Sequence, residues 1–297
     1  MIVWLASYPR SGNTLLRTVL FKTMGLMSFS DALGQKAGVT AIALQGTGVA
    51  EKIKSGDWDE FYRKASESDE VFLVKTHRPP RDDQPAIYIL RDGRKSCLSY
   101  SRYHQRFTPP PCPSLLDVVL GAGYFGGWSD HYRTWMKRGN TMLVRYEELV
   151  NAPGELLARL AETVRHAGEI APWNNPFDEL QQKNPDFFRE GRIAWQGDPA
   201  WTPLIDAAFF RLHGDLMIEL GYADAETVMA TRKDIPDEWF ELVDASRRFL
   251  AEKKAFEVVC AERHVVIDGL KKACDERQAV IDGLRLGFVR KLTRLWR

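Results

Sequence analysis

The chain has 297 residues, 44% of them hydrophobic, which is enough for one large α/β domain with a smaller additional part. Lys and Arg number 41 against 40 Asp and Glu, so the formal net charge of +1 gives no global field that would favour nucleic acid. The four cysteines include no Cys-x-x-Cys pair, which argues against a zinc site and a disulfide framework. This cysteine usage is typical of a reducing cytoplasm.

Residues 2–6 (IVWLA) are predicted to form a buried strand, and the apolar spacing that follows predicts a helix from Gly12 to about Gly25. The first residues carry no basic segment, so we interpret them as a strand and not as a signal peptide. No uncharged stretch reaches the roughly 18 apolar residues that a membrane-spanning helix needs. We therefore expect a cytoplasmic protein.

Two further apolar strands are predicted at residues 71–77 (VFLVKTH) and 86–92 (AIYILRD), each with polar residues at its carboxyl end. Residues 91–103 and 127–138 have helical patterns, and residues 141–149 (TMLVRYEEL) indicate a strand that enters a helix. Strands that alternate with helices predict a mostly parallel sheet, in which ligands bind at the carboxyl ends of the strands. The expected fold is α/β, a P-loop-type sheet flanked by helices.

The loop between the first strand and the first helix is suited to an anion. Backbone N–H groups of residues 11–14 would face the anion from a helix N-terminus, where the helix dipole favours negative charge. Arg10 adds a cation, and Ser11, Asn13 and Thr14 add side-chain donors. The simpler alternative is a capped helix start, because Ser and Asn commonly cap helices.

The same loop does not match the pattern for Mg²⁺-ATP, which is Gly, four residues, then Gly-Lys-Ser/Thr. Ser7 stands at the first Gly position and Asn13 at the Lys position. The strand of residues 86–90 is followed by Arg91, which suits a further anionic group better than a metal ion. A Mg²⁺-ATP-dependent phosphotransferase (a kinase) remains the alternative function, and a non-catalytic nucleotide-binding or scaffolding module is a third.

The loop "SYPRSGNTLL" resembles the "TYPKSGTTW" loop of the PAPS-dependent sulfotransferases, which move a sulfuryl group from 3′-phosphoadenosine-5′-phosphosulfate (PAPS) to an acceptor. Three further segments resemble that family in the same order: residues 74–77 (VKTH), 90–103 (LRDGRKSCLSYSRY) and 187–191 (FFREG). The resemblance covers about residues 2–222. It implies a sulfotransferase that uses PAPS as co-substrate and needs no metal ion.

The resemblance also implies roles for particular residues. His77 corresponds to the catalytic base, and Lys75 and Arg10 are candidates for stabilising the leaving group. Arg91 and Ser99 keep the eight-residue separation of the pair that grips the 3′-phosphate of the donor. The other candidate donor-binding residues are Arg10 itself, Ser11, Gly12, Asn13, Thr14, Tyr146, Arg189 and Gly191.

The chain departs from the family pattern at several of these positions. Arg10 stands where the family usually has Lys, and a guanidinium can stabilise charge but cannot act as a general acid. Leu15 replaces the Trp that stacks on adenine, and Glu190 removes a cation near the 3′-phosphate. The alternative for His77 is a structural histidine, and for Tyr146 a place in the core or at the rim.

The acceptor is expected to be a carbohydrate or another small molecule. Residues 27–66 and 106–127 are the predicted walls of the acceptor cleft, because they are long, irregular and contain Pro and Gly. His131 is expected to pack inside the protein from an amphipathic helix. Solvated surface positions are expected for Arg78, Arg81, Arg94 and Lys95.

Residues 233–297 are predicted to form a helical tail behind a catalytic domain of residues 1–232. Residues 260–273 (CAERHVVIDGLKKA) are followed at once by residues 274–287 (CDERQAVIDGLRLG), a repeat of 14 residues or two heptads. The resulting apolar seam contains Cys260, Ile267, Leu270, Cys274, Ile281, Leu284 and Phe288. This period predicts a coiled coil and a homo-oligomer, most simply a dimer. The alternative is a single helix packed back on the catalytic domain.

The tail has two features that modify this prediction. Arg263 and Arg277 occupy alternate seam positions, and Gly269 and Gly283 each cost a helix interior about 1 kcal/mol. The last segment, residues 287–297 (GFVRKLTRLWR), combines apolar and basic side chains. This composition predicts a peripheral contact with an anionic membrane surface.

Overall fold

The computed structural model describes residues 1–30, 58–183 and 194–295. Within these ranges five strands form one sheet in the order β2-β3-β1-β4-β5, and every neighbouring pair is parallel. The strands are β1 (Ile2–Ser7), β2 (Ser28–Ser30), β3 (Phe72–Thr76), β4 (Ala86–Leu90) and β5 (Thr141–Arg145). The predicted mostly parallel α/β sheet is confirmed.

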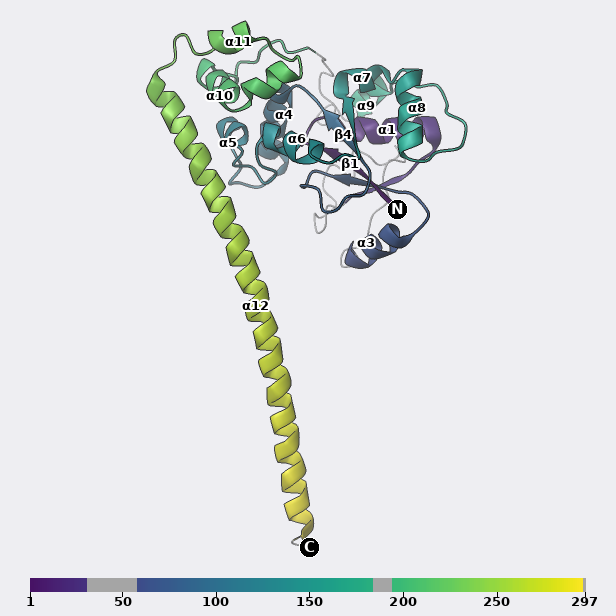
Figure 1. The fold of residues 1–297 in the computed structure, drawn as a ribbon, viewed down its shortest axis with the longest axis vertical. Coiled ribbons are helices and arrows are strands. Elements are labelled where there is room, and N and C mark those ends of the chain that lie inside the picture. The colour runs from purple at the N-terminus through teal and green to yellow at the C-terminus, as the bar shows by residue number, and fades with distance from the viewer. Residues whose placement is uncertain (31–57, 184–193, 296–297) are drawn as a thin grey trace. The chain divides into compact units, whose positions relative to one another are not determined.

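Helices connect the strands and cover both faces of the sheet (Figure 1). They are α1 (Asn13–Met24), α3 (Trp58–Glu67), α4 (Gly93–Phe107), α5 (Leu115–Leu120), α6 (Trp128–Met136), α7 (Tyr146–Asn151), α8 (Gly154–Thr163), α9 (Phe177–Lys183), α10 (Pro203–Glu219), α11 (Ala225–Ala230) and α12 (Asp237–Leu295). The predicted helices of residues 12–25, 91–103 and 127–138 correspond to α1, α4 and α6.

The hydrophobic core lies on both sides of the central strands. On one side, side chains of β1 and β4 pack with α1, α7 and α8 through residues such as Leu16, Leu149 and Leu160. On the other side, buried aromatic rings link α6 to the sheet and to α10, with Trp135 against Tyr88. Because both faces are covered, the strands read as continuous apolar runs, and β1 is buried at every residue.

Strand β2 was not predicted. It is the three-residue segment Ser28–Ser30, which pairs with β3 and lies in the region that the sequence indicated as an irregular wall of the acceptor cleft. A strand this short, with one apolar residue between two serines, carries too little alternation to be recognised. Its pairing depends on the edge that β3 offers and not on its own propensity.

The chain divides into two compact units, residues Met1–Val243 and Asp244–Arg297. The helix α12 has 59 residues, begins before this division and makes up the described part of the second unit. The predicted domain boundary after residue 232 stays a prediction.

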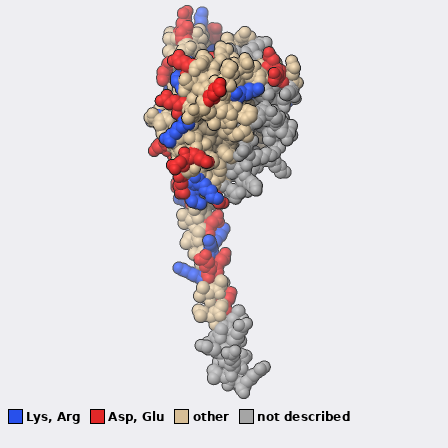
Figure 2. Space-filling model, turned by 90° about the vertical axis from the view of Figure 1, so that its right-hand side faces the viewer, with Lys and Arg blue, Asp and Glu red and all other residues tan. Residues whose placement is uncertain are grey.

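In the described part of the chain no helix is long and apolar enough to cross a membrane. On the face shown in Figure 2, acidic and basic side chains are interspersed, in keeping with the formal net charge of +1.

Candidate active site

Four strands of the parallel sheet have their carboxyl ends on the same side of the sheet, which we call the carboxyl edge. The residues that follow these ends form the candidate site. The register sets Ala6 of β1 beside Thr76 of β3, and Leu90 of β4 beside Arg145 of β5. The residues that continue from these ends are the loop of residues 8–12, His77, Arg91 and Tyr146. Parallel pairing therefore gathers segments that are far apart in the sequence.

The loop between β1 and α1 is turned by two residues in the left-handed region. Arg10 has a φ of 63° and Gly12 a φ of 108°. A Cβ at Gly12 would lie 2.5 Å from Cδ2 of Tyr146, so glycine is required there both for its backbone and for space. Ser11 is buried, and its Oγ lies 3.1 Å from Oγ of Ser96 in α4. These contacts hold the loop between α4 and the Tyr146 ring.

The side chain of Asn13 points back to β1. Its Nδ2 donates to the carbonyl of Leu5 at 2.7 Å and to Oγ of Ser7 at 3.3 Å. These bonds tie the start of α1 to the end of β1, because a buried amide needs an acceptor. The side-chain donor of Asn13 is thus engaged inside the protein, and its backbone N–H is what remains for a ligand. Thr14 is partly exposed at the next position.

Two arginines lie close together here, Arg10 of the loop and Arg91, which follows β4. Nη1 of Arg91 donates to the carbonyl of Arg10 at 3.1 Å, and Cζ of Arg91 lies 4.3 Å from the centre of the Tyr146 ring. Nε of Arg10 donates to Oγ of Ser99 at 3.2 Å, and its guanidinium lies over the ring of Tyr103. Nε of Arg91 is buried and has no hydrogen-bond partner among the described residues. A buried N–H without a partner marks a position where a ligand acceptor would be favourable.

His77 is fixed by a hydrogen bond to the end of β1. Its Nδ1 lies 2.8 Å from the carbonyl oxygen of Ser7, which requires that Nδ1 carries the proton and donates it. In the neutral ring, Nε2 is then the acceptor. Phe125 packs edge-on against the ring at 5.6 Å, and Nε2 of His131 donates to the His77 carbonyl at 2.8 Å. The ring orientation and the tautomer therefore leave Nε2 able to take up a proton.

The surroundings of His77 lower its pKa well below the usual value. Burial is the main cause, and the positive charges of Lys75 and Arg10 act in the same direction. The hydrogen bond to the Ser7 carbonyl opposes this shift. His77 is consequently neutral near pH 7, the form in which a histidine can act as a base.

Most of the predicted site residues with described positions lie at this carboxyl edge. Arg10, Ser99, Arg91 and Tyr146 are connected by the contacts above, and Lys75 is close enough to act on the charge of His77. Arg189 and Gly191 lie outside the described residues, as does most of the predicted acceptor wall of residues 27–66. Of the second wall, Phe125 contacts His77.

The surface position predicted for Arg94 is wrong, because the side chain is buried. It is 9% exposed and pairs with Asp92, with Nη2 of Arg94 2.7 Å from Oδ2 of the carboxylate. Asp92 caps α4 by accepting from the backbone N–H of Arg94. A buried carboxylate at this cap needs a cation, which explains why Arg94 is drawn inward.

A second carboxylate beside the site has a partner that no sequence motif indicated. Oε2 of Glu147, the residue after Tyr146, accepts a hydrogen bond from the hydroxyl of Tyr222 at 2.9 Å. The backbone carbonyl of Tyr222 accepts from Nη2 of Arg94 at 3.2 Å. Tyr222 thus connects the starts of α4 and α7, the helices that follow β4 and β5. The two partners are 75 residues apart, so local spacing carries no signal for the contact.

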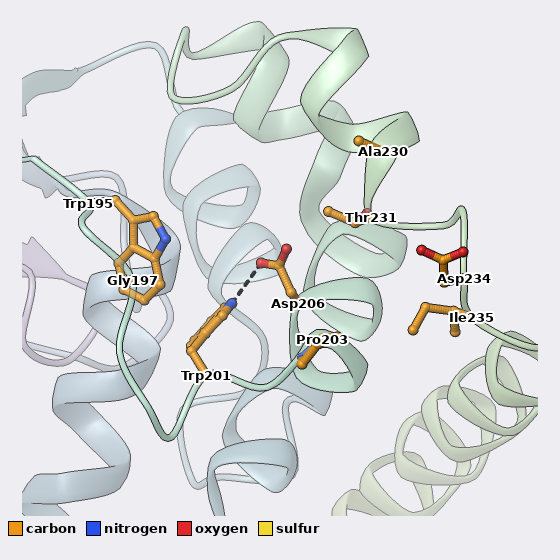
Figure 3. A pocket seen from close by; sticks show the side chains of 9 residues that line it. All are labelled: Trp195, Gly197, Trp201, Pro203, Asp206, Ala230, Thr231, Asp234 and Ile235. Atoms are coloured by element: carbon orange, nitrogen blue, oxygen red, sulfur yellow. Dashed lines mark hydrogen bonds between the residues drawn. The ribbon is translucent and has the colours of Figure 1, made fainter.

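A separate cavity of about 300 Å³ lies among α10, α11 and the segments around them (Figure 3). Nε1 of Trp201 donates to Oδ1 of Asp206 at 2.7 Å across its wall, and burial raises the pKa of Asp206. None of its lining residues is a predicted site residue. In the described ranges, no cluster of three or more His, Cys, Asp or Glu could hold a metal ion.

Tyr222→Phe is expected to lower the free energy of unfolding by about 1 to 3 kcal/mol, because Glu147 then loses the donor to its carboxylate. Oε1 of Glu147 is already buried without a hydrogen-bond partner in the described structure. Urea unfolding measures the difference. Tyr124→Phe is the control, since Tyr124 is 75% exposed and should change stability by less than about 0.5 kcal/mol. Equal stability of both variants would contradict the role assigned to the hydrogen bond.

Comparison with known proteins identifies the family. The family model described as "Sulfotransferase domain" matches residues 2–165. Among solved structures, the chain is similar to mouse sulfotransferase SULT7A1 complexed with PAP, with 18% identity and a TM-score of 0.49 over 78% of this chain and 87% of that one. Retinol dehydratase in complex with androsterone and inactive cofactor PAP gives 15% identity and a TM-score of 0.40 over 82% and 80%. No curated protein matches the chain. Because the family model spans more than half of its length, this chain belongs to the sulfotransferase domain family.

Proposed function

We propose that the protein transfers a sulfuryl group from PAPS to a hydroxyl of a carbohydrate or another small molecule. Its family supports sulfuryl transfer in general and does not favour the kinase alternative. The observation that carries the proposal is the pair of cations at the carboxyl edge. Arg91 presents a buried, unpaired Nε beside Tyr146, and Arg10 lies at the adjoining loop. PAPS carries two anionic groups, a 5′-phosphosulfate and a 3′-phosphate, and therefore requires two anion-binding sites.

In this proposal the donor lies across the ends of β1, β4 and β5. Arg91 and Ser99 bind the 3′-phosphate, and the Tyr146 ring is the candidate contact for adenine. The loop binds the 5′-phosphosulfate through backbone N–H groups of residues 11–14 and the side chains of Ser11 and Thr14. Asn13 contributes its backbone N–H. Arg189 and Gly191 complete the 3′-phosphate grip, and no metal ion takes part.

The proposed chemistry is an in-line transfer with His77 as the base. Nε2 of His77 takes the proton of the acceptor hydroxyl, whose oxygen then forms a bond to sulfur. The bond between sulfur and the bridging phosphate oxygen breaks, and its electron pair leaves with 3′-phosphoadenosine 5′-phosphate (PAP). Arg10 and Lys75 stabilise the charge that develops on that oxygen. Since Arg10 keeps its proton, its contribution is electrostatic.

We propose the following organisation and location for the protein. Residues 1–232 form the catalytic domain, and residues 233–297 form a tail through which the chain self-associates, most simply as a dimer. The protein works in the cytoplasm, and the basic segment of residues 287–297 touches an anionic membrane surface. The side chains of that segment lie outside the described structure.

Arg91→Ala is expected to weaken binding of PAP about 10- to 150-fold, because a charge-assisted contact is worth about 1.5 to 3 kcal/mol. Binding of AMP, which lacks the 3′-phosphate, should change little, so the variant loses its discrimination between the two nucleotides. Calorimetry measures both affinities. Arg81→Ala is the control, because Arg81 pairs with Asp59 on the exposed surface. A wild-type chain that binds PAP and AMP equally well would contradict the proposed donor.

His77→Ala is expected to keep its affinity for PAP and to lose turnover by about 10²- to 10⁴-fold, the usual effect of removing a general base. Single-turnover assays with saturating donor separate the chemical step from binding. Normal turnover by this variant, with an acceptor of ordinary hydroxyl acidity, would place the base elsewhere.

The rate is expected to stay constant as the pH falls to about 6.5, the ordinary histidine pKa, and to decline only below it. The reason is that His77 works in its neutral form and its pKa is lowered by burial and by Lys75. Lys75→Met removes one of the charges that lower this pKa, so the decline should begin at higher pH. Lys137→Met is the control, since Lys137 is exposed on the surface. An unchanged profile for Lys75→Met would refute the electrostatic link.

A chain that ends at about residue 250 is expected to be a folded, donor-binding monomer, whereas the full chain self-associates. The first compact unit ends at Val243, so this cut leaves it complete. Light scattering at micromolar concentration compares the two chains. A monomeric full chain, or an oligomer that persists after truncation, would rule out the tail as the element of assembly.

A further inference from the structure

The helix α12 exposes a long row of apolar side chains. The row extends the apolar seam of the sequence toward the N-terminus of the helix. Its positions are alternately three and four residues apart from Lys253 to Leu284, and they are basic at Lys253, Arg263 and Arg277. From here on, the seam means these positions. Phe256 is 69% exposed, Leu270 62% and Leu284 70%. Figure 2 shows uncharged patches that alternate with charged side chains along this helix. Large apolar side chains at such exposure mark an interaction surface.

We propose that the seam pairs with the seam of a second copy of this chain in antiparallel orientation, with Ile267 opposite Leu270 at the centre. This inference rests on the self-association proposed above and specifies its geometry. The charge and the size of the side chains that would face one another favour this orientation.

A parallel pair in register would bring each seam residue against its own counterpart. Lys253, Arg263 and Arg277 would then form three layers of like charge in a desolvated interface. Cys260 and Cys274 would form two layers in which small side chains face small side chains, which leaves space unfilled. The parallel arrangement therefore combines charge repulsion with poor packing.

The antiparallel pair removes both problems at once. Cys260 lies opposite Arg277 of the second copy, and Arg263 opposite its Cys274. Each of these two arginines thus faces the smallest side chain of the seam, which leaves room for its apolar stem while the guanidinium reaches solvent. The third basic residue, Lys253, lies opposite Leu284 of the second copy. The 14-residue repeat explains why the match holds, because it places the same residue types at both ends of the paired segment.

The apolar layers also match in this register. Phe256 lies opposite Ile281 of the second copy, and both are exposed in the single helix, at 69% and 44%. At the edge of the seam Val259 lies opposite Val280, which are 43% and 63% exposed. These layers flank the central contact of Ile267 with Leu270, so these four apolar residues of the seam gain apolar partners.

Thiol cross-linking tests the orientation in the full chain. The background is Cys112→Ser, Cys260→Ser and Cys274→Ser, with Cys97 kept because it is fully buried. Phe256→Cys and Ile281→Cys are added in separate chains. In the proposed pair, identical positions are displaced by 25 residues, or about 37 Å along the helix, whereas positions 256 and 281 of different copies share a layer. A disulfide needs Cα atoms within about 7 Å.

After oxidation, neither chain alone should give a cross-linked dimer. Coexpression of the two chains with different tags should give a disulfide between positions 256 and 281, identified by peptide mass mapping. Val258→Cys coexpressed with Ile281→Cys is the control, because Val258 lies on the opposite face of the helix and should form no link.

Three results would overturn the inference. Cross-linking of either chain with itself would show a parallel pair. A dimer in light scattering with no link between positions 256 and 281 would exclude this register. A monomeric background chain would remove the self-association on which the inference rests, and PAP binding, measured on the same sample, would still report separately on the proposed donor site.

Discussion

The site depends on the way Arg91 is held between a backbone carbonyl and an aromatic ring. One N–H of its guanidinium is bound by the Arg10 carbonyl, and its face lies on Tyr146. These two contacts fix the plane of the guanidinium, so its other N–H groups point in fixed directions. The turn at Gly12 is what allows the Tyr146 ring to come so close to the loop. The loop, β4 and β5 therefore meet at a single side chain.

The two carboxylates next to this contact have partners of their own. Asp92 and Glu147 directly follow Arg91 and Tyr146, yet Arg94 and Tyr222 bind their carboxylates. The positive potential that remains contributes to keeping His77 unprotonated. In the proposed mechanism, the charges that would bind an anionic donor also prepare the base.

The sequence predicted those features that depend on local pattern. The strand, loop and helix of residues 2–25 and the strands that carry His77 and Arg91 follow from apolar runs with polar ends, and the structure confirms them. Other features depend on contacts between distant segments. The inward turn of Arg94 and the bond from Tyr222 to Glu147 arise only when the folded chain buries carboxylates that need partners. The short strand β2 depends on its neighbour in the same way.

The most direct measurement is the transfer of label from the donor itself. The full chain is incubated with ³⁵S-labelled PAPS and a panel of carbohydrate and small-molecule hydroxyl acceptors, in excess chelator. A parallel reaction contains γ-labelled ATP and Mg²⁺. The proposed function predicts labelled sulfate esters in the first reaction and no labelled product in the second. Phosphoryl transfer from ATP, with no sulfuryl transfer from PAPS to any acceptor, would contradict it.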